Sequence, residues 1–162
     1  MIKLITLNIW QGRLFRNYPD FLKEEQADII CLQEVYKSDK KIPTLELFSN
    51  ISTAQEASGL EYSFFSPVHG YKVMGVNVQF GNCILSRTPL ENQTAIFTSG
   101  EYLEFTDPSD YVNNIRNAQI ASVNIDGQSL TVVNHHGYWE LSPTGSNEST
   151  KSLGVLSQAL SG

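Results

Sequence analysis

Two polar side chains close apolar segments in the first quarter of the chain, at positions where they could act together. Asn8 ends the run Ile2–Asn8, and Glu34 ends the run Asp28–Glu34. If both runs are neighbouring strands of an α/β sheet, these side chains lie at its carboxyl edge, where such sheets bind ligands. A carboxylate beside an amide oxygen is a pair of hard oxygen donors, which suits Mg²⁺ or Mn²⁺. A solvated strand-end charge and a turn residue are the alternative interpretation, which the pattern alone leaves open.

A second polar group follows an apolar run near residue 130. The segment Val132–Trp139 contains Asn134, His135 and His136. Side chains alternate between the two faces of a strand, so the two histidines are expected to point to opposite sides. One of them can donate a hydrogen bond to a phosphate oxygen, while the other packs or meets solvent. An ordinary packed or solvated histidine is the alternative for either, and His69, in a turn-like context, is expected to be structural or at the surface.

Aromatic and arginine side chains near these positions could bind a substrate. Trp10, Tyr36 and Trp139 each follow one of the polar strand ends, where they could line a pocket or stack on a base. Packing inside the protein is an equally good interpretation for each of them. Arg116 and Arg87 could hold a phosphate through two hydrogen bonds, although a surface ion pair is the preferred interpretation for Arg87.

The elements that must position these residues are predicted from periodicity and turn chemistry. Strands are expected over residues 2–8, 28–34, 62–65, 73–78, 82–86, 117–125 and 129–135. Helices are expected over Asn17–Ala27, with Pro19 in the first turn, and from about Thr150 to the end. Asp126-Gly127 is the strongest hairpin signal. Residues 38–59 are ambiguous, with a helix after Pro43 as one option. The order of elements predicts one mixed α/β domain over residues 1–162.

Composition narrows the function classes. Asp and Glu number 17 against 11 Lys and Arg, giving a net charge of −6. A basic footprint of the kind that holds duplex DNA is therefore not expected, although an enzyme that meets phosphate through a bound cation stays open. No run of eighteen apolar residues and no signal peptide occur, so we expect no membrane span and a cytoplasmic location. Cys31 and Cys83 lie in apolar runs and are expected to be buried and reduced.

Four segments, taken in order, resemble the endonuclease/exonuclease/phosphatase superfamily, whose best-known fold is that of DNase I. They are Leu4-Ile-Thr-Leu-Asn-Ile-Trp10, Ala27-Asp-Ile-Ile-Cys-Leu-Gln-Glu-Val35, Gly81-Asn-Cys-Ile-Leu-Ser-Arg-Thr-Pro-Leu90 and Leu130-Thr-Val-Val-Asn-His-His136. The Leu-Gln-Glu-Val element is the most specific, followed by Asn-x-His. The resemblance extends from Ile2 to about Leu160. It implies an α/β fold that is a four-layer sandwich of two mixed sheets flanked by helices.

The resemblance also implies roles for individual residues. The counterpart of Glu34 binds a divalent metal, usually Mg²⁺, and the counterpart of Asn8 lies beside it in the metal and catalytic site. The histidine of the Asn-x-His element contacts the scissile phosphate, and here that residue is His136. The expected substrate contacts are Asn134, Arg116, Tyr36 and Trp10. The implied reaction is hydrolysis of a phosphate ester by an activated water, with nucleic acid among the candidate substrates.

Two elements of the family pattern are missing from the sequence. Members of the family continue past the helix equivalent to Thr150–Leu160 into a strand ending in Gly-Asp-x-Asn and a final Ser-Asp-His element. The chain contains neither Asp-x-Asn nor Asp-His. We therefore expect a fold that is incomplete at its C-terminus. We also expect the isolated chain to hydrolyse phosphate esters slowly. A truncated enzyme, one part of a split enzyme and a non-catalytic interaction or assembly module are the alternatives. Either a homo-oligomer or a complementing chain is the expected partner.

Overall fold

The apolar strands of the chain form two sheets. The computed structural model describes residues 1–13, 17–40, 46–141 and 144–161. The larger sheet contains β1 (Leu4–Asn8), β2 (Ile29–Ser38), β4 (Val76–Ser86), β3 (Tyr62–Val73) and β6 (Leu103–Glu104), in that order. The smaller sheet contains β5 (Leu90–Ser99), β7 (Arg116–Ile125) and β8 (Gln128–His135), in that order. The larger sheet is mixed because β1–β2 and β3–β6 are parallel, whereas the strand pairs of the smaller sheet are antiparallel.

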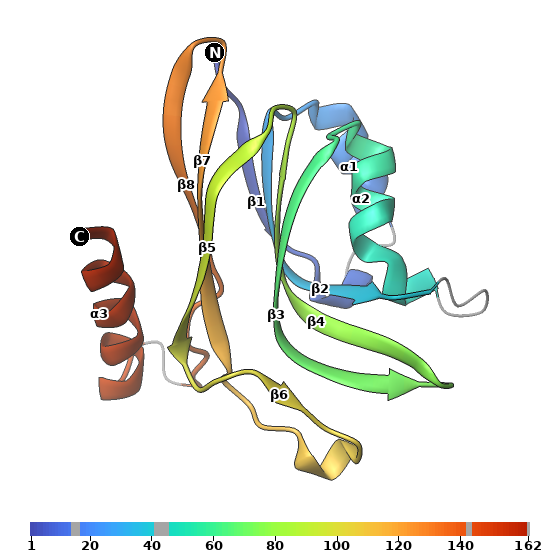
Figure 1. Cartoon of the computed structure of the whole chain (residues 1–162), viewed down its shortest axis with the longest axis vertical. Helices are drawn as coiled ribbons and strands as arrows, with labels where there is room; N and C mark the ends of the chain where they lie inside the picture. The colour runs from blue at the N-terminus through green and yellow to red at the C-terminus, as the bar shows by residue number, and fades with distance from the viewer. Residues whose placement is uncertain (14–16, 41–45, 142–143, 162) are drawn as a thin grey trace.

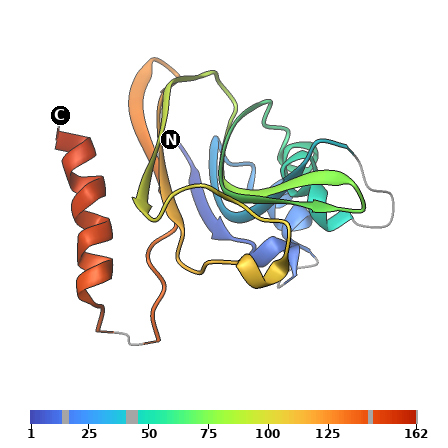
Figure 2. The ribbon, with the colours of Figure 1, turned by 60° about the horizontal axis from the view of Figure 1, so that its bottom comes forward.

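Helices cover the outer faces of both sheets. Figure 1 shows α1 (Tyr18–Glu25) and α2 (Asn50–Ser58) against the larger sheet, and α3 (Asn147–Ser161) beyond β5 of the smaller one. Figure 2 shows the same separation of α3 from the other helices in a turned view. Three short 3-10 turns connect these elements: η1 (Trp10–Gly12), η2 (Glu46–Ser49) and η3 (Pro108–Asp110). The arrangement is the four-layer α/β sandwich that the family resemblance implied, with an antiparallel smaller sheet in place of a mixed one among the described residues.

Alternate residues of β2 build two separate cores. Ile30 and Leu32 face the cluster beneath α1 and α2, while Ile29 and Cys31 face the cluster between the two sheets. This double burial explains why the segment is apolar on both faces, as strands covered on two sides are. Cys31 and Cys83 are buried and free, and burial raises the pKa of both thiols to about 12. The expectation of two reduced, unbonded cysteines is confirmed.

The structure corrects the expected strand boundaries in the middle of the chain. β3 and β4 form one long hairpin, and the predicted strand over residues 73–78 is wrong because it contains the turn. Met74 and Gly75 both have positive φ, 50° and 78°, the backbone of a two-residue hairpin turn. β5 was not predicted at all, because its first half, 91–95, is exposed and polar except for one alanine. Pro43 lies outside the described residues; the helical segment after it begins with η2.

The β7–β8 hairpin confirms the Asp126-Gly127 signal, since these residues have φ of 52° and 81°. Within the described residues β8 pairs only with β7, and none of its eight residues is Lys, Arg, Asp or Glu. An uncharged open edge can accept another strand. The expected homo-oligomer or complementing chain therefore stays a prediction. None of the described helices has the length and apolarity needed to span a bilayer.

His69 lies inside β3 rather than in a turn. It is 6% exposed, and its ring stacks on Phe80 with 4.7 Å between ring centroids. Its Nδ1 atom is buried and has no hydrogen-bond partner among the described residues. Burial, with a smaller contribution from the charge of Arg116, lowers the pKa of His69 to about 4. The neutral imidazole is thus part of the aromatic core.

We expect stability to fall as the pH drops from about 6.5 to about 4, because the unfolded chain protonates His69 before the folded chain does. At about 1.4 kcal/mol per pH unit, this histidine alone accounts for roughly 3 kcal/mol. His69→Phe keeps the stacked ring and removes the titration, so its urea unfolding free energy should depend less steeply on pH. Equal pH slopes for the variant and the wild type would contradict the burial of a neutral His69.

Candidate active site

Parallel pairing and a β-bulge bring Asn8 and Glu34 together. Asn8 on β1 pairs with Gln33 on β2, and the register between β2 and β4 shifts between Leu32 and Val35. Glu34 lies in this bulge with φ of 57°, a left-handed conformation that a glutamate adopts only under constraint. β2 therefore continues past Glu34 to Ser38, and the expectation that the strand ends at Glu34 is wrong. A bulge re-aims its side chain away from the strand's alternation.

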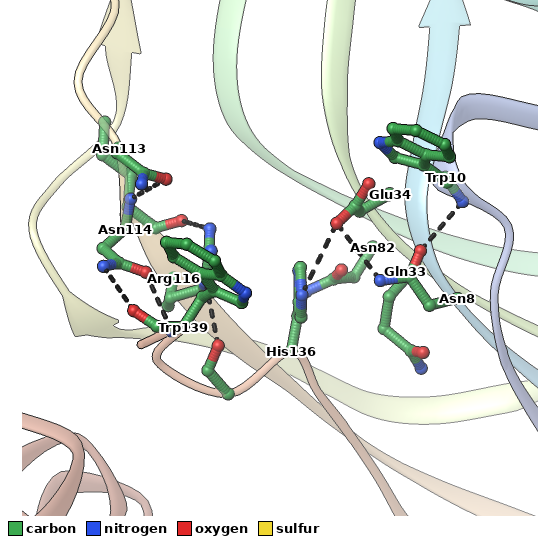
Figure 3. Close-up of polar contacts among 12 residues, drawn as sticks. Asn8, Trp10, Gln33, Glu34, Asn82, Asn113, Asn114, Arg116, His136 and Trp139 are labelled. Atoms are coloured by element: carbon green, nitrogen blue, oxygen red, sulfur yellow. Dashed lines mark hydrogen bonds and ion pairs between the residues drawn. The ribbon is translucent and has the colours of Figure 1, made fainter. Parts of the chain in front are cut away.

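Three polar side chains from distant parts of the sequence meet at this bulge (Figure 3). The Nδ2 of Asn8 donates a hydrogen bond to Oε1 of Glu34 at 3.1 Å. The same Oε1 lies 3.7 Å from Nε2 of His136, which directly follows β8. The side chains of Glu34 and His136 are both mostly buried, at 19% and 21% exposed. The structure thus brings together Asn8, Glu34 and His136, which the sequence singled out.

His136 is held in its neutral form. Burial is the main cause, and the charges of Arg116 and His135 add to it, so the pKa of His136 falls to about 4. A neutral imidazole offers one N–H donor and one acceptor at pH 7. His135 points the other way, where its Nε2 lies 3.0 Å from Oγ1 of Thr98. The prediction that the two histidines face opposite sides is confirmed.

Arg116 places a buried positive charge next to this group. It opens β7, is 8% exposed, and donates from Nε to the carbonyl of Gly137 at 2.9 Å and from Nη1 to the carbonyl of Ile115 at 3.1 Å. Burial lowers the pKa of its guanidinium, whereas the nearby Glu34 acts in the opposite direction. Arg116 makes no ion pair with any described residue. Because a buried charge without a counter-ion is costly, this position favours a bound anion.

Arg87 forms surface ion pairs, as the sequence analysis preferred for this residue. It pairs with Asp28 at 2.8 Å and with Asp126 at 2.6 Å, next to the β7–β8 turn. These ion pairs occupy its guanidinium near the start of β2, five residues before Glu34, since Ile29 at the start of β2 pairs with Ser86. Arg87 is therefore a surface ion-pairing residue in this structure.

Asn134 does not reach the site, and its expected substrate contact is wrong. The residue is 1% exposed and lies between the two sheets. Its Oδ1 accepts a hydrogen bond from Nε2 of Gln33 at 2.7 Å. Its Nδ2 donates to the carbonyls of Leu32 and Cys83 and to Oε1 of Gln119. The hydrogen bonds of Asn134 therefore connect the two sheets and position β2, the strand that carries Glu34.

Replacing Asn134 with alanine should lower the free energy of unfolding by about 3 kcal/mol, because several buried polar groups lose their partner at once. Urea denaturation at neutral pH measures this change. The matched control is Asn77→Ala, an exposed asparagine with one side-chain hydrogen bond, to Asp39, which should stay within about 0.5 kcal/mol of the wild type. An Asn134→Ala variant as stable as the wild type would contradict this structural role.

Tyr36 follows Glu34 by two residues on β2, and its expected substrate contact stays a prediction. It is buried in the aromatic cluster at the far end of β2, with ring centroids 5.0 Å from Phe48 and 5.2 Å from Phe80. Burial raises the pKa of its hydroxyl well above the ordinary value. Packing, the alternative interpretation for this residue, is the one that the structure favours.

Trp10 contacts the site residue Asn8 through its backbone N–H. Its N–H donates to Oδ1 of Asn8 at 2.8 Å, and Figure 3 shows its indole beside Glu34. Asn114, which the sequence analysis missed, holds Trp139: its Nδ2 donates to the carbonyl of Trp139 and its Oδ1 accepts from the N–H of Trp139, each at 2.9 Å. The signal that could have found it is the pair Asn113-Asn114, because asparagine tolerates the left-handed backbone that Asn114 adopts at φ 61°.

The donor atoms at the bulge fit a hard divalent cation that also binds the substrate. The described residues contain no group of three or more His, Cys, Asp or Glu that could enclose a metal ion. Glu34 instead offers carboxylate oxygens, and the amide oxygen of Asn8, which accepts the N–H of Trp10, has a second lone pair that can face a cation. Mg²⁺ is commonly held by one or two carboxylates and completes its shell with water and substrate phosphate. These residues therefore fit a cation shared with a phosphate better than a closed structural metal site.

Comparisons with known proteins bear on the family and the fold of the chain. Residues 5–154 match the model of the Endonuclease/Exonuclease/phosphatase family. No curated protein sequence matches the chain significantly. A family protein from Leptotrichia buccalis C-1013-b has a similar fold, with a TM-score of 0.65 at 16% identity over 98% of this chain and 63% of that one.

Two further solved structures share the fold. An endonuclease/exonuclease/phosphatase from Beutenbergia cavernae DSM 12333 has a TM-score of 0.66 at 15% identity over 96% of this chain and 43% of that one. D. rerio TDP2 complexed with single strand DNA product has a TM-score of 0.62 at 18% identity, covering 99% and 54%. The chain thus spans between 43% and 63% of the length of these three structures.

Proposed function

Because the chain belongs to the endonuclease/exonuclease/phosphatase family, we propose that it is a divalent-metal-dependent phosphoesterase that hydrolyses a phosphodiester or a phosphomonoester by attack of water. Membership of this family indicates a hydrolase acting on phosphoesters, and the family generally uses divalent metals. Asn8, Glu34 and His136 are the residues that we propose for the reaction.

The observation that carries this proposal is the buried cation of Arg116 beside Glu34 and His136. A positive charge at 8% exposure, with no ion pair to a described residue, is stabilised when an anion binds next to it. Planar guanidinium groups bind phosphate oxygens through paired N–H donors. The hydrogen bonds to Gly137 and Ile115 fix the guanidinium, so little freedom is lost when the phosphate binds.

Each residue of the site has a separate part in this proposal. Glu34 and Asn8 would hold Mg²⁺ or Mn²⁺, which when bound supplies charge neutralisation on the phosphate and a more acidic water. The neutral His136 donates its N–H to a phosphate oxygen, where negative charge grows during the reaction. Asn8 orients the carboxylate of Glu34 through its amide hydrogen bond and fixes the turn at Trp10.

We propose a slow reaction for this chain, because its sequence contains neither the Asp-x-Asn nor the Asp-His element to which the family resemblance assigns the orientation of the water. A non-catalytic interaction module is the competing proposal, and the open, uncharged edge of β8 is the observation that favours it. Both proposals use the same fold, and fold alone does not choose between them.

A divalent-ion titration tests the enzyme proposal. The purified chain is incubated with bis(para-nitrophenyl) phosphate and with para-nitrophenyl phosphate at increasing Mg²⁺, and nitrophenolate release is followed by absorbance. We expect slow release from at least one ester, rising to a plateau with Mg²⁺ and abolished by a chelator. A rate that never exceeds the protein-free reaction at any Mg²⁺ concentration would reject the enzyme and favour the interaction module.

A further inference from the structure

Trp10 presents its indole from a strained turn. Three successive residues, Trp10, Gln11 and Gly12, have positive φ of 40°, 61° and 79°. A bulky side chain rarely adopts this backbone, and such strain persists where the surroundings enforce it, often at ligand sites. The hydrogen bond to Asn8 and that from Gly12 to the carbonyl of Ile9 at 2.7 Å enforce it here. The indole is nevertheless 47% exposed, so packing in the protein does not explain the strain.

Trp139 is a second exposed indole on a fixed backbone. It is 53% exposed, and the two hydrogen bonds with Asn114 hold its peptide group from both sides. Arg116 fixes the same segment through the carbonyl of Gly137. Large apolar side chains that stay exposed on a backbone fixed by hydrogen bonds are poorly explained by folding, since folding gains little from side chains that it does not bury.

The two indoles lie on either side of the proposed phosphate site. Figure 3 shows Trp10 beside Glu34 and Trp139 beside Arg116, with His136 between them. The hydrogen bonds support this placement, because Trp10 is bonded to Asn8, and Asn8 to Glu34, whereas Trp139 follows His136 by three residues. A phosphate held by Arg116 and His136 therefore has a flat aromatic surface in each direction along its ester chain.

Building on the proposed function, we propose that Trp10 and Trp139 are base-stacking platforms and that the substrate is a single-stranded polynucleotide with the scissile phosphodiester between the two stacked bases. Indoles stack on any base, whose π-face is free in a single strand but covered in a duplex. Two platforms flanking one phosphate require an internal phosphodiester, because a terminal phosphate has a base on one side only.

The charge distribution favours a single strand over a duplex. Residues 82–162 carry three Lys and Arg against eight Asp and Glu, and the net charge of the chain is −6. Duplex binding relies on many phosphate contacts and is steeply salt dependent, whereas stacking needs few. Arg13 is next to Trp10 in the turn, with its backbone N–H bonded to the carbonyl of Trp10 at 3.0 Å, and Arg116 is bonded to the carbonyl of Gly137, two residues before Trp139. We therefore expect a shallow salt dependence, with a slope near one or two released ions.

Intrinsic fluorescence can test this inference directly, because Trp10 and Trp139 are the two tryptophans of the sequence. The probe is a short oligothymidylate, compared with an abasic oligomer of the same length, in the presence of a chelator so that no cleavage occurs. We expect saturable quenching by oligothymidylate and binding of the abasic oligomer that is about tenfold weaker. Trp10→Ala and Trp139→Ala should each weaken oligothymidylate binding about tenfold, measured by anisotropy of a labelled strand.

Conservative and distant variants complete the design. Trp10→Phe and Trp139→Phe keep a stacking ring, so each should retain most of the affinity and leave the other indole as the sole reporter. Tyr62→Ala removes an exposed aromatic ring at the start of β3, which pairs with the end of β4 far from the bulge, and should change nothing.

Equal affinity for the abasic oligomer, or full affinity after both alanine substitutions, would overturn the inference. A response to phosphatidylcholine vesicles in place of oligothymidylate would overturn it in favour of a membrane surface. The outcome is separable from that of the proposed function. Oligothymidylate stacking without Mg²⁺-dependent hydrolysis would contradict the proposed enzyme activity and leave the stacking proposal intact. Hydrolysis of para-nitrophenyl esters without base-dependent binding would contradict the stacking proposal and leave the enzyme activity intact.

Discussion

Glu34→Gln is expected to lower the rate of Mg²⁺-dependent phosphoester hydrolysis about a hundredfold or more. The substitution preserves the volume of the side chain and an oxygen that can accept the hydrogen bond from Asn8, but it removes the negative charge. Glu34 is the carboxylate that contacts both Asn8 and His136, so its loss removes the charge that attracts a cation to the bulge. Charge stabilisation by a catalytic metal is worth several kcal/mol, and each 1.4 kcal/mol is about tenfold in rate.

Initial rates across a Mg²⁺ titration measure this effect, because weakened binding moves the midpoint and lost chemistry lowers the plateau. Glu61→Gln is the matched control: it removes an exposed carboxylate directly before β3 and should leave both quantities unchanged. A Glu34→Gln variant with the wild-type plateau and midpoint would remove Glu34 from the mechanism.

His136→Ala is expected to lower kcat by about 10² to 10³, the usual cost of deleting one donor to developing negative charge. Burial and the charge of Arg116 keep His136 neutral, so at pH 7 it acts as a hydrogen-bond donor and not as a cation. His136→Gln places an amide N–H near the position of Nε2 and should recover part of the loss. The substrate concentration at half-maximal rate should change less than kcat, since the interaction strengthens in the transition state.

The neighbouring histidine provides an internal control for this prediction. His135→Ala removes an imidazole one residue away that faces Thr98 on the other side of the strand, and should alter kcat less than tenfold. If His135→Ala were as damaging as His136→Ala, the loss would reflect disruption of β8 and not a contact with phosphate.

Local sequence patterns predicted the elements around the site well. The strand at β1, the start of β2, the helix at α1 and the hairpin at Asp126-Gly127 all depend on nearest neighbours and appear within two residues of where they were expected. Glu34 was expected at a strand end, but its exposure to the site arises from a bulge in β2. The bulge depends on the register with β4, where Leu32 and Val35 pair with Cys83 and Gly81. Such a register is a property of two distant segments, which a one-dimensional pattern does not contain.

Burial was the other property that the sequence did not determine. Asn134 was expected at the substrate as part of the Asn-x-His element, and Tyr36 because it follows the predicted strand over residues 28–34. The structure buries Asn134 among four partners and Tyr36 among aromatic rings. Polar residues between two packed sheets resemble functional residues in sequence, because both kinds interrupt an apolar run. Only the packing of the second sheet separates them.

Mn²⁺ binding tests the central claim, that Glu34 and Asn8 form a divalent-metal site, most directly. Free Mn²⁺ gives a sharp electron paramagnetic resonance signal that broadens on binding, so titration of the wild type and of Glu34→Gln gives the number of ions bound without requiring turnover. We expect one Mn²⁺ per wild-type chain, displaced by Mg²⁺, and at least about tenfold weaker binding by Glu34→Gln. Equal binding by the two proteins, or no binding by the wild type, would contradict it.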